Sequence, residues 1–379
     1  MIAGRPLDKD NLSVFIDRVY KTGNYQFVIT RTRAEEARLE VLLYPVDFVK
    51  TTLALGGGFQ GTLSAGTARA LTIRGDVQFR GLTGPGSALV VGSSWTDDLS
   101  LALFYVQPLG RRAFVSARGE ITINYGALFA GFPPGEPVIT GALGQVSVGM
   151  YMNENNTLTA AGGVVFADPA REYPAGEPTT ALYANAVYEW SRLDYGLFAT
   201  RGFYAALENT AYFPLPPEAA PVYDVVSLAV SGAIPLNRSL SVIINGFAGS
   251  DVTGRLIDTP SRLPLGGFTG RDRMYFPHIT AGDRYGAHKG AASLILQYQP
   301  WQNLTFLGGQ LLFSVSAAVG EVAADWGDFS PDGLLWNASL NAGLRLLKSF
   351  GAQVRIGAGK SPDGRIGPFV SLDIGAFRY

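Results

Sequence analysis

Residue types that catalyse reactions or bind metals are few in this chain, and their spacing offers little chemistry. The two histidines, His278 and His288, stand ten residues apart without a third ligand cluster, and there is no cysteine. A disulfide framework and a thiolate metal site are therefore excluded. No phosphate-binding loop or dinucleotide fingerprint appears, because the glycines are dispersed through strand-like segments. We expect no metal and no cofactor.

Hydrolytic chemistry has no support in the sequence either. A Gly-x-Ser-x-Gly elbow holds an exposed serine on a strained turn, and no serine here has glycines at that spacing. Paired carboxylates such as Asp97 and Asp98, or Asp325 and Asp328, fall in expected turns and loops, where solvation explains them. The sequence predicts that this chain is not an enzyme.

One segment differs from the rest of the chain. The stretch PLGGFTGRDRMYFPHITAGDRYGAHKG, residues 264–290, is crowded with glycine, arginine and aspartate. Its glycines allow sharp bends and close approach to other backbone, and its arginines can pair with acidic groups elsewhere. Two interpretations stay open: a loop folded against other parts of the protein, or a surface loop whose charges are solvated.

The elements around this segment alternate apolar and polar residues with period two. The alternation is clear in residues 71–80, 115–125 and 336–346. Successive side chains of a strand point to opposite faces, so each segment has one apolar and one polar face. We count about sixteen such segments, most of them about 10–14 residues long, whereas strands of soluble proteins average about 5–6.

The connections between these segments alternate in length. Short turns separate loops that are expected to be long, at residues 127–140, 168–177, 209–222, 251–285 and 319–333. Short turns on one side and long loops on the other are typical of an outer-membrane barrel. We predict an all-β membrane protein in which residues 47–379 form an antiparallel transmembrane β-barrel of about 16 strands.

Composition agrees with this prediction. Charged residues make up 16% of the chain, below the roughly 25% of soluble domains. No apolar run approaches the ~18–20 residues of a transmembrane helix. The net charge of −1 offers no basic face for nucleic acid, so no nucleic-acid partner is expected.

Residues 1–46 follow a different pattern. Leu12, Phe15, Ile16 and Val19 recur with helical spacing, and two strand-like runs, YQFVITRT and ARLEVLLY, come next. A helix and two strands are too few to bury a core alone. We predict a partial α+β module, the second half of something larger.

The order of these parts resembles a known superfamily. A partial module, about sixteen strands and a long glycine-rich loop after the eleventh strand are similar to the BamA-type superfamily of outer-membrane assembly and translocation proteins, the bacterial surface antigen barrels. Within it, the chain looks most like the POTRA-plus-barrel part of patatin-like type V autotransporters. The resemblance covers essentially the whole chain, and it makes residues 1–46 a partial POTRA module.

The resemblance implies roles for particular residues. Residues 251–286 would form a lumen-directed loop whose arginine and aromatic tip contacts the inner barrel wall. Met274 stands where the family pattern has glycine. The last strand ends on aromatic residues, which resembles the C-terminal insertion signal of bacterial outer-membrane barrels. The residues matched to the loop anchor are Gly266, Gly267, Arg273, Tyr275 and, as a substitute acidic partner on the wall, Glu321; those of the insertion signal are Phe377 and Tyr379.

The implied function is translocation: secretion, surface display or assembly of an attached or partner polypeptide. The implied location is the bacterial outer membrane, with the N-terminal module in the periplasm. The expected partners are outer-membrane lipids, the polypeptide passenger or partner, and the outer-membrane assembly machinery. A hydrolase domain could lie upstream in a longer parent protein. The alternatives are a passive pore or structural barrel and, as a third reading, a soluble all-β binding protein.

Overall fold

The structure is a computed structural model. It describes residues 25–35, 38–47, 51–62, 67–84, 86–95, 98–110, 112–124, 138–153, 155–167, 179–193, 201–215, 222–253, 263–265, 267–268, 275–276, 284–300, 310–346, 350–360 and 364–376.

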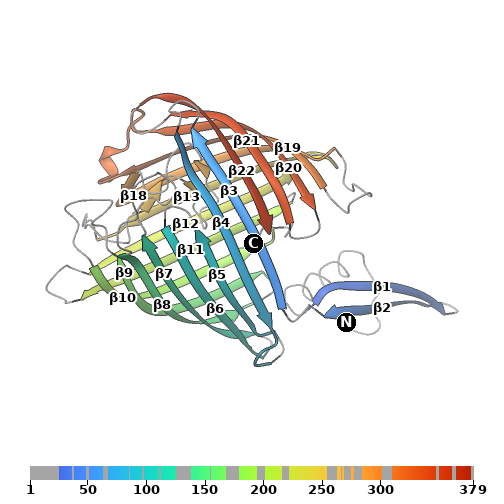
Figure 1. Cartoon of the computed structure of the whole chain (residues 1–379). Coiled ribbons are helices and arrows are strands. Elements are labelled where there is room, and N and C mark those ends of the chain that lie inside the picture. Colours follow the sequence, from blue (N-terminus) through green and yellow to red (C-terminus); the bar gives the residue numbers. More distant parts are fainter. Residues whose placement is uncertain are drawn as a thin grey trace.

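Long strands dominate the described residues, and sixteen of them form one antiparallel sheet that closes into a barrel. Strands that neighbour each other in sequence also neighbour each other in the sheet, apart from the excursion between β13 and β18 (Figure 1). The strands are β3 Thr51–Thr62, β4 Thr67–Arg80, β5 Ala88–Trp95, β6 Asp98–Leu109, β7 Ala113–Asn124, β8 Val138–Tyr151, β9 Asn156–Ala167, β10 Thr179–Ser191, β11 Gly202–Leu215, β12 Tyr223–Pro235, β13 Leu240–Asp251, β18 His288–Tyr298, β19 Gln310–Ala323, β20 Leu335–Leu346, β21 Phe350–Lys360 and β22 Ile366–Ala376.

The prediction of an all-β antiparallel fold is confirmed, and the longest loop follows the eleventh barrel strand, β13, as expected. Two predicted loops are wrong in part. Residues 209–215, expected in a loop, belong to β11, and residues 319–323 belong to β19. The polar run at Asn209 and Thr210 resembles a turn, but each side chain has a partner on a neighbouring strand. Asn209 Nδ2 donates to Asp224 Oδ1, and Thr210 Oγ1 accepts from Asn185.

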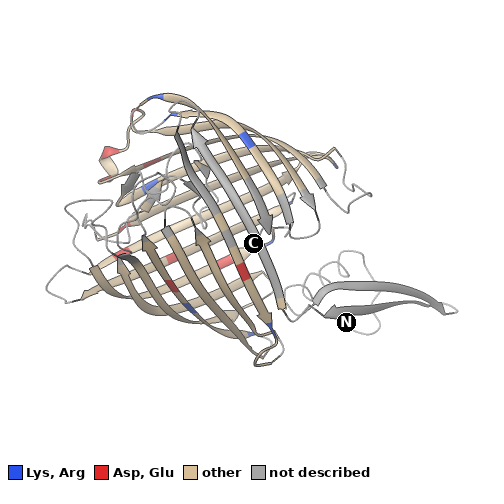
Figure 2. Ribbon diagram, viewed as in Figure 1, with Lys and Arg blue, Asp and Glu red and all other residues tan. Residues whose placement is uncertain are grey.

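The two faces of the barrel strands differ in chemistry, as the period-two pattern predicts. On β19, Phe313, Val315 and Val319 are exposed, whereas Ser314 and Ala318 between them are buried. The exposed apolar side chains recur on most strands and form the outer face of the barrel. Figure 2 shows that charged residues are sparse along the described strands. A soluble sandwich would bury such an apolar face against a second sheet.

The inner face is lined by small polar side chains that bond to one another across strands. Ser231 Oγ donates to Asn245 Oδ1 over 2.7 Å, and Asn245 Nδ2 donates to Ser293 Oγ over 2.9 Å. Asn341 Nδ2 likewise donates to Ser314 Oγ over 3.0 Å. We call these five residues the polar wall. Their mutual hydrogen bonds satisfy polar groups that are largely shielded from solvent.

The N-terminal part contributes one antiparallel hairpin, β1 Tyr25–Glu35 and β2 Arg38–Asp47, which lies outside the barrel (Figure 1). Its strands coincide with the two strand-like runs of the sequence. The helix expected before them lies outside the described residues, so the POTRA module and the boundary at residue 46 stay predictions. Among the described residues, no helix is long and apolar enough to cross a membrane.

The apolar outer face generates a first prediction. Leu340, in the middle of β20, and Ile366, at the start of β22, are each 66% exposed on this face. In lipid vesicles, Leu340→Arg should lower the free energy of unfolding by about 2–4 kcal/mol, and Ile366→Arg by only about 0–1 kcal/mol, because the cost of arginine depends on depth in the bilayer. Denaturant titration of both variants in vesicles measures the difference. Equal, near-zero costs would indicate that both side chains face water.

Candidate functional site

The long loop between β13 and β18 is folded rather than extended. Near its base, β14 Leu263–Leu265 pairs with β17 Arg284–Gly286. Further along, β15 Gly267–Phe268 pairs with β16 Tyr275–Phe276. The glycine-rich sequence of this segment allows these two short pairings within little chain length. The pairings hold the outgoing and returning arms of the loop together.

This folded loop packs against the inner face of the barrel. Leu265 and Phe276 of the loop are each 1% exposed, and they form an apolar cluster with Ala318 and Val322 of β19 and Leu335 of β20. Ala318 has the same parity along β19 as the inward-facing Ser314 of the polar wall, so the contact lies on the inner face. We call these five residues the loop–wall cluster. It fixes the loop inside the barrel through apolar burial.

Two glycines of the wall make room for the loop. A Cβ atom on Gly320 of β19 would lie 2.9 Å from Phe276 Cζ and 3.1 Å from Leu265 Cδ1. A Cβ atom on Gly249 of β13 would lie 2.8 Å from Leu263 Cδ1. Real Cβ atoms essentially never approach other atoms closer than 3.0 Å, so a side chain at either glycine would force the contacting loop side chains to shift.

A buried cation borders the loop–wall cluster. Lys289 is 2% exposed, and its Nζ lies 4.8 Å from the centroid of the Phe247 ring, whose side chain packs against the cluster. An ammonium over an aromatic face is attracted by the ring quadrupole, more strongly when it is desolvated. Lys289 therefore adds an electrostatic contact where the base of the loop meets β13 and β18.

The structure describes only part of the predicted anchor. Gly267 lies on β15 and Tyr275 lies on β16. Both therefore belong to the hairpin in the part of the loop that packs on the wall. Gly266 and Arg273 lie outside the described residues. The contact of the arginine with the wall therefore stays a prediction.

Glu321 occupies a different setting from the one expected for a lumen partner. It is out of phase with Ala318 and Val322 along β19, so alternation places it on the outer parity. Its carboxylate accepts from the backbone N–H of Ser330, with both oxygens 3.2 Å from that nitrogen. The acidic side chain thus stabilises the β19–β20 loop.

One histidine, His288, lies among the described residues, at the start of β18. The His288 ring stacks on Trp326, with centroids 4.7 Å apart, and its Nδ1 lies 2.9 Å from Ser250 Oγ. His278 lies outside the described residues. Within the described part of the chain, no group of three or more metal-binding side chains comes together. His288 has a structural setting, between a hydroxyl and an indole ring.

The barrel closes where β22 pairs with β3. This ladder spans seven residue pairs, from Phe369↔Thr62 to Gly375↔Gly56, whereas every other described ladder of the barrel spans eight to twelve. Both strands continue beyond the shared ladder, because they are staggered against each other. The residues of the predicted insertion signal, Phe377 and Tyr379, follow β22 and lie outside the described residues.

Three residues of this site had no assigned role at the sequence level: Phe276, Gly320 and Gly249. Their signal is present but indirect. A glycine in an otherwise apolar strand, as in AAVGEV, marks a point where another part of the chain approaches closely. The sequence does not reveal which aromatic residue of the loop fills the space.

The closed barrel is similar in fold to solved structures of outer-membrane β-barrels. The sequence matches no protein-family model, and no curated protein matches it. BamA from Haemophilus ducreyi lacking POTRA domains 1–3 is similar with a TM-score of 0.59 and 14% identity, over 99% of this chain and 80% of that chain. CdiB from Acinetobacter baumannii gives a TM-score of 0.63 and 12% identity over 99% and 69%. CdiB from Escherichia coli gives 0.60 and 14% over 98% and 72%.

The loop–wall cluster generates a second prediction. Phe276→Ala should remove about 3 kcal/mol of packing between loop and wall, and so raise the rate of trypsin cleavage at the arginines of the loop about a hundredfold. Peptide mapping of the detergent-solubilised protein measures the rate. Phe313→Ala, which removes an exposed outer-face ring from the same β19, is the control and should leave the rate unchanged. Equal rates in both variants would mean that the cluster does not hold the loop.

Proposed function

We propose that the chain is an outer-membrane β-barrel translocator, which mediates secretion, surface display or assembly of an attached or partner polypeptide. The observation that carries the proposal is the packing of the long loop on the inner wall, in a barrel whose fold is similar to those of BamA and CdiB. The polypeptide is the substrate, and outer-membrane lipids and the assembly machinery are the other partners.

The N-terminal segment has its place in this proposal. Residues 1–46 act as a partial POTRA module on the periplasmic side, in keeping with the domain order of patatin-like type V autotransporters. The β1–β2 hairpin supplies two strands of that module. Binding of a periplasmic polypeptide beside the hairpin would place it near the β3 end of the barrel seam, since β3 follows β2 directly in the chain.

Opening of the barrel for a polypeptide occurs most easily at the β22–β3 seam. In hydrocarbon every backbone N–H and C=O group must keep a partner, so the ladder with the fewest pairs is the least costly to exchange. An incoming strand can supply replacement hydrogen bonds by β-augmentation. At the seam, the backbone groups of β22 and β3 can thus exchange their hydrogen-bond partners without being left unpaired.

A disulfide across the seam tests this mechanism. Gln60 and Ser371 are directly paired, and opposed residues of an antiparallel ladder have Cα atoms about 4.5–5.5 Å apart, within the ~4.4–6.8 Å span of a disulfide. The chain has no cysteine of its own. The oxidised Gln60→Cys/Ser371→Cys variant should lose about nine-tenths of passenger export, which reduction should restore; immunoblotting of the surface-exposed passenger measures it.

The control pair lies away from the seam. Ser116 and Ser147 are opposed on β7 and β8 and bond to each other, so Ser116→Cys/Ser147→Cys adds a disulfide to a ladder that has no need to open. Oxidation of this variant should leave export unchanged. Undiminished export through the oxidised seam variant would contradict seam opening.

The polar wall favours the second candidate function, a passive pore, because polar inner faces are typical of water-filled barrels. Planar-bilayer conductance separates the two functions. A translocator whose lumen is occupied by the loop should show small, flickering currents, and deletion of residues 264–286 should raise the conductance several-fold. A large, stable current with the loop intact would favour the pore.

A further inference from the structure

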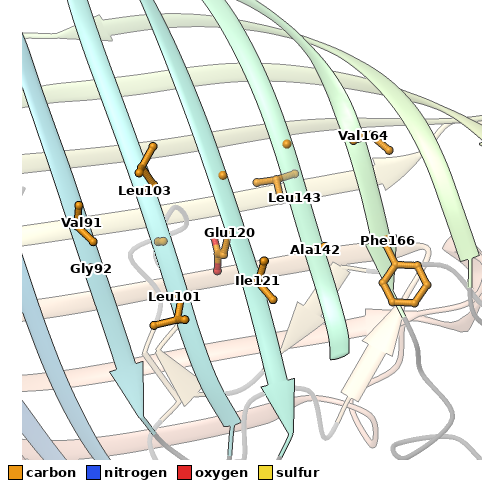
Figure 3. Close-up of a pocket in the computed structure, with 13 residues that line it drawn as sticks. Val91, Gly92, Leu101, Leu103, Glu120, Ile121, Ala142, Leu143, Val164 and Phe166 are labelled. Atoms are coloured by element: carbon orange, nitrogen blue, oxygen red, sulfur yellow. The ribbon is translucent and has the colours of Figure 1, made fainter. Parts of the chain in front are cut away.

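The outer face of the barrel carries an apolar groove of about 580 Å³ that spans β5 to β9 (Figure 3). Its floor lies on β7 and β8, at Gly119, Gly144 and Ala142. Leu103 of β6 forms one wall and Val164 of β9 the other. The remaining lining residues are Val91, Gly92, Leu101, Ala102, Glu120, Ile121, Leu143 and Phe166.

The register of four strands creates the groove. Leu103 pairs with Gly119, Gly119 with Gly144, and Gly144 with Val164. Two glycines therefore stand side by side in a row whose flanking members are branched side chains. A Cβ atom on Gly119 would have no other atom within 4 Å, so the space above it is open. The groove is an absence of side chains in an otherwise apolar band.

The groove is lined almost entirely by apolar groups. Leu101, Leu103 and Ile121 around it are 43–46% exposed on the outer face. The one ionisable lining residue, Glu120, is out of phase with Gly119 and Ile121; its carboxylate pairs with Arg118 and accepts from Ser100 Oγ, both of the inner parity. The glycine backbone groups belong to the sheet ladders. The groove is therefore suited to an apolar ligand.

We propose that this groove binds one acyl chain of the glycolipid that fills the outer leaflet of the outer membrane. The inference rests on the proposed function, which places the barrel in that membrane. The groove is continuous with the exposed apolar outer face of the barrel. In that membrane it is therefore surrounded by the hydrocarbon chains of lipids. Its floor is only two strands wide between branched walls, which suits a single flexible chain. A transmembrane helix, about 10–12 Å across with its side chains, needs a broader seat.

The position along the strands selects the leaflet. Ala142 and Phe166 lie close to the ends of β8 and β9 that carry the connections 125–137 and 168–178. These connections are on the same side of the barrel as the long loop, because strands alternate in direction. With the N-terminal module in the periplasm, this is the outer side. The groove runs from the middle of the strands, at Gly119 and Gly144, toward this outer side, and its outer part lies in the leaflet of saturated glycolipid chains.

Native mass spectrometry of the full chain tests the proposal. The delipidated protein in mild detergent is incubated with lipid A or, separately, with phosphatidylethanolamine, and the retained lipid is counted. The wild-type chain should retain one lipid A molecule. Gly119→Leu should reduce the retained fraction about tenfold, because its side chain replaces roughly two methylene contacts of the acyl chain. Ala142→Leu, on the neighbouring strand, should act in the same direction.

The matched control is Gly162→Leu. Gly162 lies on the outer face of β9, where a Cβ atom would meet only the Tyr183 carbonyl oxygen at 3.7 Å, and it is not part of the groove. This variant should retain lipid A as the wild type does. Heat-dependent gel mobility checks that each variant is folded.

The outcomes separate this inference from the proposed function. Loss of lipid A in Gly119→Leu and Ala142→Leu, with retention in Gly162→Leu, supports the groove. Retention of phosphatidylethanolamine alone, equal retention in all variants, or no retained lipid overturns it, while normal passenger export in the same variants leaves the translocator standing. A chain that does not fractionate with membranes overturns both.

Discussion

Pairing of every backbone hydrogen-bonding group within one closed sheet is the constraint on which this structure depends. An open sheet has two edges with unpaired N–H and C=O groups, and a barrel removes them by joining its first strand to its last. The β22–β3 ladder makes that join with seven pairs. Closure has a consequence inside the barrel as well, because sixteen strands enclose more space than their own side chains fill.

The long loop occupies part of this enclosed space. The composition of the barrel wall changes where the loop contacts it. An inner face in contact with water alone would be polar throughout. Here the polar wall gives way, beside the loop, to Ala318, Val322 and Leu335, with Gly320 among them. The wall changes from hydrogen-bonded serine and asparagine to apolar and small residues at the place where Leu265 and Phe276 arrive. Two parts of the chain, remote in sequence, are thus matched in shape and polarity.

Much of the fold could be predicted from the sequence because the pattern is local. Period-two alternation locates β20 and β7 closely, and the run of glycine and charge locates the long loop. Strand boundaries were predicted wrongly where partners on neighbouring strands override local sequence preference. Residues 209–215 have the composition of a loop, but they form part of β11, where Asn209 donates a hydrogen bond to Asp224. The contacts of the site were harder to predict from the sequence. That Phe276 fills the space over Gly320 depends on the register of β19, which no single segment encodes.

The two loops that flank β19 hold this part of the barrel from opposite sides. The long loop packs on its inner parity at Ala318, and the β19–β20 loop bonds to its outer parity at Glu321 and stacks Trp326 on His288. Separating β18 from β19 would therefore disrupt side-chain packing on both faces as well as an eleven-pair ladder. The seam ladder has seven pairs in the described residues. Since each backbone bond contributes a similar net free energy of about 0.5–1.5 kcal/mol, the seven-pair ladder of the seam is less costly to separate than the eleven-pair β18–β19 ladder. In the order of the sheet, β22 lies three strands from β19, so the two loops stiffen a part of the barrel near the seam without crossing it.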